Sequence, residues 1–289
     1  MRLLSLVTVI WAFSFSLIGV YLAGQLDSYF AVLVRVALAS LIFLPLTDFG
    51  LRARWKWALM GIGAIQIGVM YLFFYQSFRY LSVPEVLLFT VFTPIYVSVL
   101  YDGLHRRFRL QYLLTAALAV AGAWVIKSAH VNPGFLTGFL LVQGANIAFA
   151  LGQVLYKRLL ETPALSDTRQ SKIFGYFHFG ALGVSLVAFG LFGETSRIVP
   201  TPTQWAVLLW LGIAASGAGY FLWNRGATQV DAGVLAIMNN AVVPLGLIVN
   251  RLFWGKSIDT TALILGGGMI FGALWLHMRF LRTTTAPDT

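Results

Sequence analysis

Leu-Ala-Ile-Met-Asn-Asn-Ala-Val-Val-Pro, residues 235–244, lies within an apolar run from 232 to 254. At about 1.5 Å of rise per residue, such a run can cross a bilayer as one helix. Asn239 and Asn240 stand near its middle, and Pro244 follows Asn240 at the fourth position. Because proline has no N–H, the Asn240 carbonyl is expected to lose its helical donor. Two interpretations stay open: a kink whose amides join neighbouring helices, or a substrate site near the middle of the membrane.

Composition places the rest of the chain in the membrane as well. Of the 289 residues, 59% are hydrophobic and only 10% are charged, which is too little charge for a soluble domain of this size. The recurring apolar runs predict an all-α integral membrane protein with ten transmembrane helices. We expect these helices at residues 3–23, 29–47, 56–80, 83–101, 110–129, 135–157, 172–193, 203–225, 232–254 and 259–280. No extramembrane domain fits between them.

The net charge of +10 follows topology and does not indicate a nucleic-acid partner. Most basic residues fall on alternate loops, which is the positive-inside pattern. The loops on the more basic side carry Arg2; Arg52, Arg54 and Lys56; Arg106, Arg107 and Arg109; Lys157, Arg158, Arg169 and Lys172; Arg225; Arg279 and Arg282. The other side carries Arg79, Lys127, Arg197, Arg251 and Lys256. The pattern predicts a multi-pass protein with both termini in the cytoplasm.

The sequence also repeats itself. An offset of 150 residues places Pro94 on Pro244 and Thr90 on Asn240, so each half has a polar side chain four residues before a proline within a predicted helix. The same offset relates Trp55 to Trp205 and Gly122-Ala123 to Gly272-Ala273. We therefore expect two five-helix repeats at residues 1–130 and 135–282, followed by a disordered tail at 283–289. Because five is odd, the second repeat must be inverted, and inverted repeats are typical of transporters that hold substrate at the repeat interface.

Arg35 is the only basic residue deep within a predicted helix, and Glu85 is the only acid clearly inside one. A charge inside the membrane is costly, so it marks either a function or a structural ion pair. One interpretation is an Arg35–Glu85 ion pair. The other is that Arg35 binds a substrate carboxylate with its bidentate guanidinium, with Glu85 as resting counter-ion or coupling group.

Several other polar and aromatic side chains are predicted near the middle of the spans. Trp11 must place its indole N–H on a polar partner and is a candidate cavity wall. Gln143 and Asn146 are three residues apart and share a helix face. Trp223 and Asn224 are candidates for an inner gate, whereas the small residues from Ala214 to Gly219 are expected to allow close helix packing. The candidate substrate-binding residues are Trp11, Arg35, Gln66, Tyr71, Thr90, Gln143, Asn146, Trp223, Asn239 and Asn240.

Motifs for catalysis are missing. The four histidines are scattered and there is no cysteine, and the sequence contains no zincin motif, nucleophile elbow, Walker loop or paired metal-binding acids. We therefore expect no enzyme activity, no cofactor and no metal. Without an ATP-hydrolysing part, transport must use an ion gradient, exchange or the gradient of the substrate itself.

The chain resembles the drug/metabolite transporter superfamily of the EamA-domain type over nearly its whole length. The resemblance rests on the ten predicted helices in two halves, on Trp-Ala-Phe-Ser-Phe at residues 11–15, on Arg35 in the second span and on the paired Pro94 and Pro244. Longer strings are similar to bacterial biotin transporters of its carboxylate/amino-acid branch. These strings are residues 11–16, 21–24, 27–36, 87–91, 226–233 and 237–240.

This resemblance implies alternating-access import of biotin across the bacterial inner membrane. The ureido ring of biotin would suit the carboxamides, its apolar parts would suit the aromatic walls, and its carboxylate would suit Arg35. An exporter of amino acids or related metabolites on the same fold is the alternative, and a non-transporting membrane receptor is a third class. The partners expected are a small-molecule substrate and the lipid bilayer, with the protein acting as a monomer.

Overall fold

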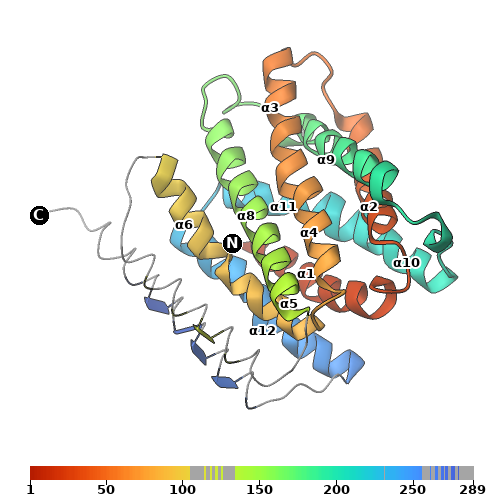
Figure 1. Ribbon diagram of the computed structural model, residues 1–289. Helices are drawn as coiled ribbons and strands as arrows, with labels where there is room; N and C mark the ends of the chain where they lie inside the picture. The colour runs from red at the N-terminus through yellow and green to blue at the C-terminus, as the bar shows by residue number, and fades with distance from the viewer. Residues whose placement is uncertain are drawn as a thin grey trace, which may run out of the picture.

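The computed structural model describes residues 1–104, 134–230 and 232–255, with scattered positions between 114 and 125 and between 261 and 279. This part of the chain is a bundle of helices joined by short turns (Figure 1). Seven helical stretches in it are long and apolar enough to cross a membrane. The described part of the chain is therefore all-helical, and the protein is a multi-pass membrane protein. The predicted spans at 110–129 and 259–280 lie outside the continuously described residues.

The helices before residue 105 form four apolar stretches, each of which contains a change of helix type. The elements are α1 (Arg2–Leu17) with a π-helical extension Ile18–Leu22, α2 (Ser28–Phe43) with a 3₁₀ turn Leu44–Leu46, α3 (Ala53–Gly63) continued by a π-helical segment Ala64–Val69 into α4 (Met70–Ser77), and α5 (Val83–Phe89) continued by a 3₁₀ turn Thr90–Phe92 into α6 (Thr93–Leu104).

The helices from residue 134 onward form four further stretches. They are α8 (Phe135–Leu160), α9 (Gln170–Phe192), a 3₁₀ turn Thr195–Arg197, α10 (Pro202–Trp210) continued by a π-helical segment Leu211–Ala218 into α11 (Gly219–Ala227), and α12 (Ala232–Trp254). The bounds agree with the predicted spans within a few residues. The ends differ by at most three residues, for example in the third span, which was predicted to end at residue 80. It ends at Ser77 because the amides of Arg79 and Tyr80 bond to carbonyls three residues back and turn the chain.

The packing brings helices from distant parts of the sequence together. α1 lies against α11 and α12, whereas α8 lies against α4 and α6, and Figure 1 shows α8 between α6 and the α3–α4 helix. α9 packs along α2 and α3. Glycines permit the closest of these crossings: a Cβ at Gly63 would clash with the Phe177 carbonyl, and a Cβ at Gly180 would clash with the Met60 carbonyl. The α3 and α9 backbones therefore touch, as small residues allow in membrane helices.

Hydrogen bonds show which loops share an end of the bundle. At one end the Asp48 N–H donates to the Lys172 carbonyl (2.8 Å), and the Lys157 ammonium donates to the Val230 carbonyl (3.2 Å). This end therefore gathers three of the loops on which the basic residues are concentrated.

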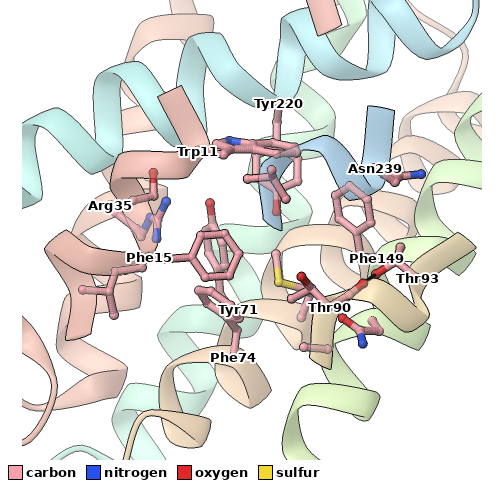
Figure 2. A pocket seen from close by; sticks show the side chains of 16 residues that line it. Trp11, Phe15, Arg35, Tyr71, Phe74, Thr90, Thr93, Phe149, Tyr220 and Asn239 are labelled. Atoms are coloured by element: carbon pink, nitrogen blue, oxygen red, sulfur yellow. Dashed lines mark hydrogen bonds between the residues drawn. The ribbon is translucent and has the colours of Figure 1, made fainter. Parts of the chain in front are cut away.

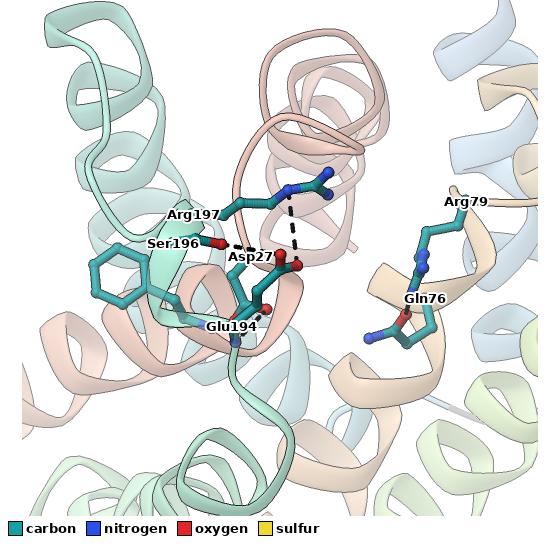
Figure 3. Close-up of polar contacts among 7 residues, drawn as sticks. Asp27, Gln76, Arg79, Glu194, Ser196 and Arg197 are labelled. Atoms are coloured by element: carbon teal, nitrogen blue, oxygen red, sulfur yellow. Dashed lines mark hydrogen bonds and ion pairs between the residues drawn. The ribbon is translucent and has the colours of Figure 1, made fainter.

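At the opposite end, Asp27, labelled in Figure 3, caps α2 by accepting from the Phe30 N–H (2.7 Å). Its carboxylate also accepts from the Glu194 N–H (3.2 Å), so it ties the loop after α1 to the loop after α9. Arg79 and Gln76 form a separate contact there.

Candidate functional site

A cavity of about 100 Å³ lies between two groups of helices. This volume is room for several water molecules, since one needs roughly 10–15 Å³. One wall comes from α1, α11 and α12, the other from α4, the α5–α6 region and α8, and α2 contributes Arg35. The lining residues are Trp11, Ser14, Phe15, Ile18, Arg35, Met70, Tyr71, Phe74, Thr90, Thr93, Ala145, Asn146, Phe149, Tyr220, Asn239 and Val242. Aromatic rings occupy the middle, with Arg35 on one side and Asn239 on the other (Figure 2).

Arg35 lies at this cavity with only 2% of its surface exposed. Its Nε donates to the Ser216 hydroxyl (2.8 Å) and its Nη1 to the Tyr75 hydroxyl (2.9 Å). The guanidinium carbon lies 4.0 Å from the centre of the Tyr71 ring, a cation–π distance. The Tyr71 and Ser216 hydroxyls are also hydrogen-bonded, at 2.9 Å. All of these partners are uncharged, so the Arg35 charge is solvated by dipoles and a ring face.

Glu85 does not neutralise Arg35. Its carboxylate accepts from the Ser82 N–H (2.7 Å) and from the Ser82 hydroxyl (2.6 Å), at the first turn of α5. This is a capping-box arrangement, in which an acid three residues after the N-cap satisfies the free end of the helix. The interpretation of Arg35 and Glu85 as an ion pair is therefore wrong for this conformation. Within the described part of the chain, Arg35 has no acidic partner.

The first of the two proline helices is interrupted beside the cavity. Pro94 falls in the first turn of α6, where a missing N–H is tolerated. The Thr93 N–H and hydroxyl both donate to the Thr90 carbonyl, the latter at 2.8 Å. Because the Thr93 N–H is diverted from its helical acceptor, the Phe89 carbonyl is free to accept from Asn146 Nδ2 (2.8 Å). The break thus exposes backbone oxygens to side chains of other helices.

The adjacent amides of α12 behave differently from one another. Asn240 Nδ2 donates to the Val91 carbonyl at 3.4 Å, so it reaches the interrupted helix from the opposite wall. Asn239 lines the cavity, and its Nδ2 has no hydrogen-bond partner although the residue is only 7% exposed. A buried amide without a partner is costly. Asn239 is therefore a candidate donor for a polar ligand group.

A π-helical segment accepts the hydrogen bond of the cavity residue Trp11. Its indole Nε1 donates to the Ala215 carbonyl (3.0 Å), which belongs to the π-helical segment between α10 and α11. The Trp11 ring also lies 5.1 Å from the Tyr220 ring and 5.9 Å from the Phe149 ring, centre to centre. π-Helical turns are rare and are often found at functional sites. The polar partner that the sequence required for this tryptophan is present.

The structure brings six of the ten candidate binding residues to the cavity. These are Trp11, Arg35, Tyr71, Thr90, Asn146 and Asn239. The other four lie just outside its lining and bind other side chains or backbone. Gln66 Nε2 donates to Asn224 Oδ1 (3.2 Å), Gln143 Oε1 accepts from the Tyr96 hydroxyl (3.1 Å), Trp223 Nε1 donates to Gln153 Oε1 (2.9 Å), and Asn240 contacts Val91. Gln143 Oε1 also accepts from Asn146 Nδ2 at 3.2 Å, which confirms their shared face.

Sequence reasoning missed Ser216 and most of the aromatic lining. Ser216 lies in a run of glycine and alanine and was assigned to packing, yet it holds both Arg35 and Tyr71. The internal repeat offered one signal for Ser216, since the offset of 150 residues aligns it with Gln66, a candidate binding residue. The same offset aligns Tyr220 with Met70. Phe15, Phe74 and Phe149 carried no such signal, because phenylalanine is common throughout this chain.

Comparison with known proteins gives consistent results. The sequence profile of the EamA-like transporter family matches residues 2–128 and, a second time, residues 136–278. A Pseudomonas aeruginosa protein named probable biotin transporter is 52% identical over 96% of this chain and 97% of its own length. The biotin transporter of Escherichia coli K12 is 48% identical over 100% of this chain and 97% of its own length.

Similarity extends to the solved structures. One crystal structure, of a protein given no further description, is 15% identical and superposes with a TM-score of 0.67 over 99% of this chain and 98% of its own. At that identity the match concerns the fold alone.

Proposed function

This chain belongs to the EamA-like transporter family, and on that premise we propose that it imports biotin across the bacterial inner membrane. The proposal is supported by the relatives of this chain together with the polar groups of the cavity. Relatives named biotin transporter are about half identical over nearly the full length, and the cavity offers a cation at one side and amides at the other.

Biotin matches the cavity group by group. Its carboxylate suits Arg35, because a guanidinium has five N–H donors and the bonds to Ser216 and Tyr75 use two of them. Its thioether ring and aliphatic chain suit the aromatic rings between the two polar ends. Its ureido group has two N–H donors and a carbonyl, which Asn239, Asn146 and Thr90 can complement.

The surroundings of Arg35 favour an anionic cargo. Removing a charge from water is expensive unless an opposite charge or several hydrogen bonds replace the water. In the described part of the protein, only neutral partners replace water around the Arg35 guanidinium. A bound carboxylate would supply the missing negative charge, whereas a neutral cargo would leave the guanidinium unpaired. Arg35 is thus the residue that selects for the acid group.

The proposed orientation follows the charge distribution. The loops at residues 47–52, 161–169 and 228–231 share one end of the bundle through the contacts of Asp48, Lys172, Lys157 and Val230. Arg52, Arg169 and neighbouring basic residues accumulate at this end, so it faces the cytoplasm by the positive-inside rule.

The mechanism we infer is alternating access between two inverted five-helix repeats, at residues 1–130 and 135–282. Three features support the duplication. The family profile matches twice. The third helix of each half contains a π-helical segment near its middle, Ala64–Val69 and Leu211–Ala218. The first helix of each half packs on the third and fourth helices of the other half. Rocking of the two helix groups would open the cavity to one side at a time.

The test is uptake of radiolabelled biotin into proteoliposomes that contain the purified protein. We expect saturable uptake, and we expect Arg35→Gln to reduce uptake at low substrate on the order of 100-fold, because a charged hydrogen-bonded pair is lost. Arg251→Gln, at an exposed position in α12, is the matched control for loss of one positive charge. Uptake that unlabelled amino acids suppress as well as unlabelled biotin, or uptake that survives Arg35→Gln unchanged, contradicts the proposal.

A further inference from the structure

Two helices carry a continuous line of side chains from the cavity toward the basic end of the bundle. Along α8 the line is Asn146, Phe149, Gln153 and Lys157, and along α11 it continues from Tyr220 through Asn224 to Thr228. Positions three and four residues apart lie on the same face of a helix. Asn146, Phe149 and Tyr220 line the cavity. The side chains beyond them therefore lie on the route from the cavity to the cytoplasmic end.

The first layer beyond the cavity is held by two side-chain hydrogen bonds. Trp223 Nε1 donates to Gln153 Oε1 at 2.9 Å, and Gln66 Nε2 donates to Asn224 Oδ1 at 3.2 Å. All four residues are at most 1% exposed. The Trp223 ring lies 4.9 Å from the ring of Trp11, a cavity residue. Each bond joins α11, in one wall of the cavity, to a helix of the other wall.

The next layer contains a polar cleft of about 230 Å³. It begins one helical turn beyond the two bonds, with Lys157 on α8 and Thr228 at the end of α11. Gln170 Nε2 donates to the Thr228 hydroxyl at 3.3 Å across this cleft. The order along the two helices is thus cavity, hydrogen-bonded layer and polar cleft.

We propose that the Trp223–Gln153 and Gln66–Asn224 hydrogen bonds form the inner gate, and that cargo leaving the cavity passes through this layer into the polar cleft beyond it. This inference rests on the proposed transport function and orientation. Any opening of the cavity toward the cytoplasm must separate the two helix groups at this layer, so both bonds must break.

The chemistry of the layer suits a gate. Gln66 Oε1 and Gln153 Nε2 are buried without a partner, so each amide keeps a free group that water or cargo can bind when the layer opens. Neutral hydrogen bonds contribute little net stability, which allows them to break and reform during transport. The amides can also bind a passing ureido group in turn.

The absence of cysteine from the sequence allows a direct test. Ala145, which lines the cavity, is replaced by cysteine as a reporter. Its reaction with a negatively charged, membrane-impermeant thiosulfonate reagent is followed from each face of oriented membrane vesicles. Gln153→Ala and Trp223→Phe each remove the same hydrogen bond, and Trp223→Phe preserves most of the ring packing. Ser185→Ala is the control, because the hydroxyl of this buried serine bonds only to its own helix, at Ala181.

We expect each gate variant to raise the labelling rate from the cytoplasmic face about fivefold, the effect of one typical hydrogen bond on an equilibrium. The double variant should give no further increase, because both changes remove one bond. Ser185→Ala should leave the rate unchanged. Unchanged rates in both gate variants, or faster labelling only from the opposite face, overturn the gate.

Protection of the reporter cysteine by biotin tests the gate proposal and the identity of the cargo separately. If the variants accelerate labelling but saturating biotin does not slow it, the gate stands and biotin is the wrong cargo. If biotin protects the reporter cysteine while neither variant changes its rate, the cargo stands and the gate is rejected.

Discussion

The two proline-containing helices at the cavity start from the same pattern and end in different structures. Each has a polar residue four positions before its proline, Thr90 before Pro94 and Asn240 before Pro244. In the first, the helix breaks into α5, a 3₁₀ turn and α6. In the second, α12 runs unbroken through its proline. Proline alone therefore does not decide whether a helix breaks.

The local hydrogen bonds explain the difference. In the broken helix the Thr93 hydroxyl, next to the proline, satisfies the Thr90 carbonyl, and the tighter turn frees the Phe89 carbonyl for Asn146. In α12 the corresponding position is Val243, which has no hydroxyl to donate. The broken helix supplies acceptors to the site, whereas α12 supplies amide donors through Asn239 and Asn240. The two helices are thus complementary across the cavity.

The largest expected effect comes from removing the break. Pro94→Ala restores an N–H for the Thr90 carbonyl and lets the Thr93 N–H return to the Phe89 carbonyl, which displaces Asn146. Biotin uptake by proteoliposomes should fall on the order of 10- to 100-fold, because a buried amide loses its acceptor. Pro244→Ala is the matched control and should change uptake less than about twofold, since α12 is already continuous. Equal losses in the two variants would show that the helices are equivalent after all.

A smaller effect distinguishes the two amides that reach the broken helix. Asn146→Ala leaves the Phe89 carbonyl buried without its 2.8 Å donor, and we expect a loss of about 2 kcal/mol in the free energy of unfolding. Asn240→Ala removes a longer contact of 3.4 Å and should cost less than about 1 kcal/mol. Thermal unfolding in detergent measures both. A larger loss for Asn240→Ala would reverse the assignment of the stronger contact.

The smallest effect concerns Asn239, whose Nδ2 has no partner in the protein. Asn239→Ala should therefore leave thermal stability unchanged and weaken biotin binding about fivefold, the value of one hydrogen bond to a neutral group. Equilibrium binding of radiolabelled biotin to the detergent-purified protein measures this change. A variant that is destabilised yet binds biotin normally would make Asn239 a structural residue.

The sequence predicted the seven stretches long enough to cross a membrane, the α12 helix and six of the residues that line the cavity, because hydrophobic length and isolated polar groups are strong signals in a membrane. It did not predict the break at Thr90, since the decisive hydroxyl of Thr93 is an ordinary residue until the turn forms. It paired Glu85 with Arg35 as one option, although Ser82-Val83-Pro84-Glu85 has the spacing of a capping box. Ser216 was missed because its role depends on α2 lying against the π-helical segment Leu211–Ala218.

On the proposed function, biotin passes through the cavity between the two proline-containing helices. Ala145→Phe places a ring in this cavity from α8, whereas Ile147→Phe adds a ring on the same helix at a position that is 42% exposed. The measurement is the initial rate of radiolabelled biotin uptake by proteoliposomes that contain equal amounts of each folded variant. We predict that Ala145→Phe abolishes uptake and that Ile147→Phe transports like the unaltered protein. Full uptake by Ala145→Phe would contradict this prediction.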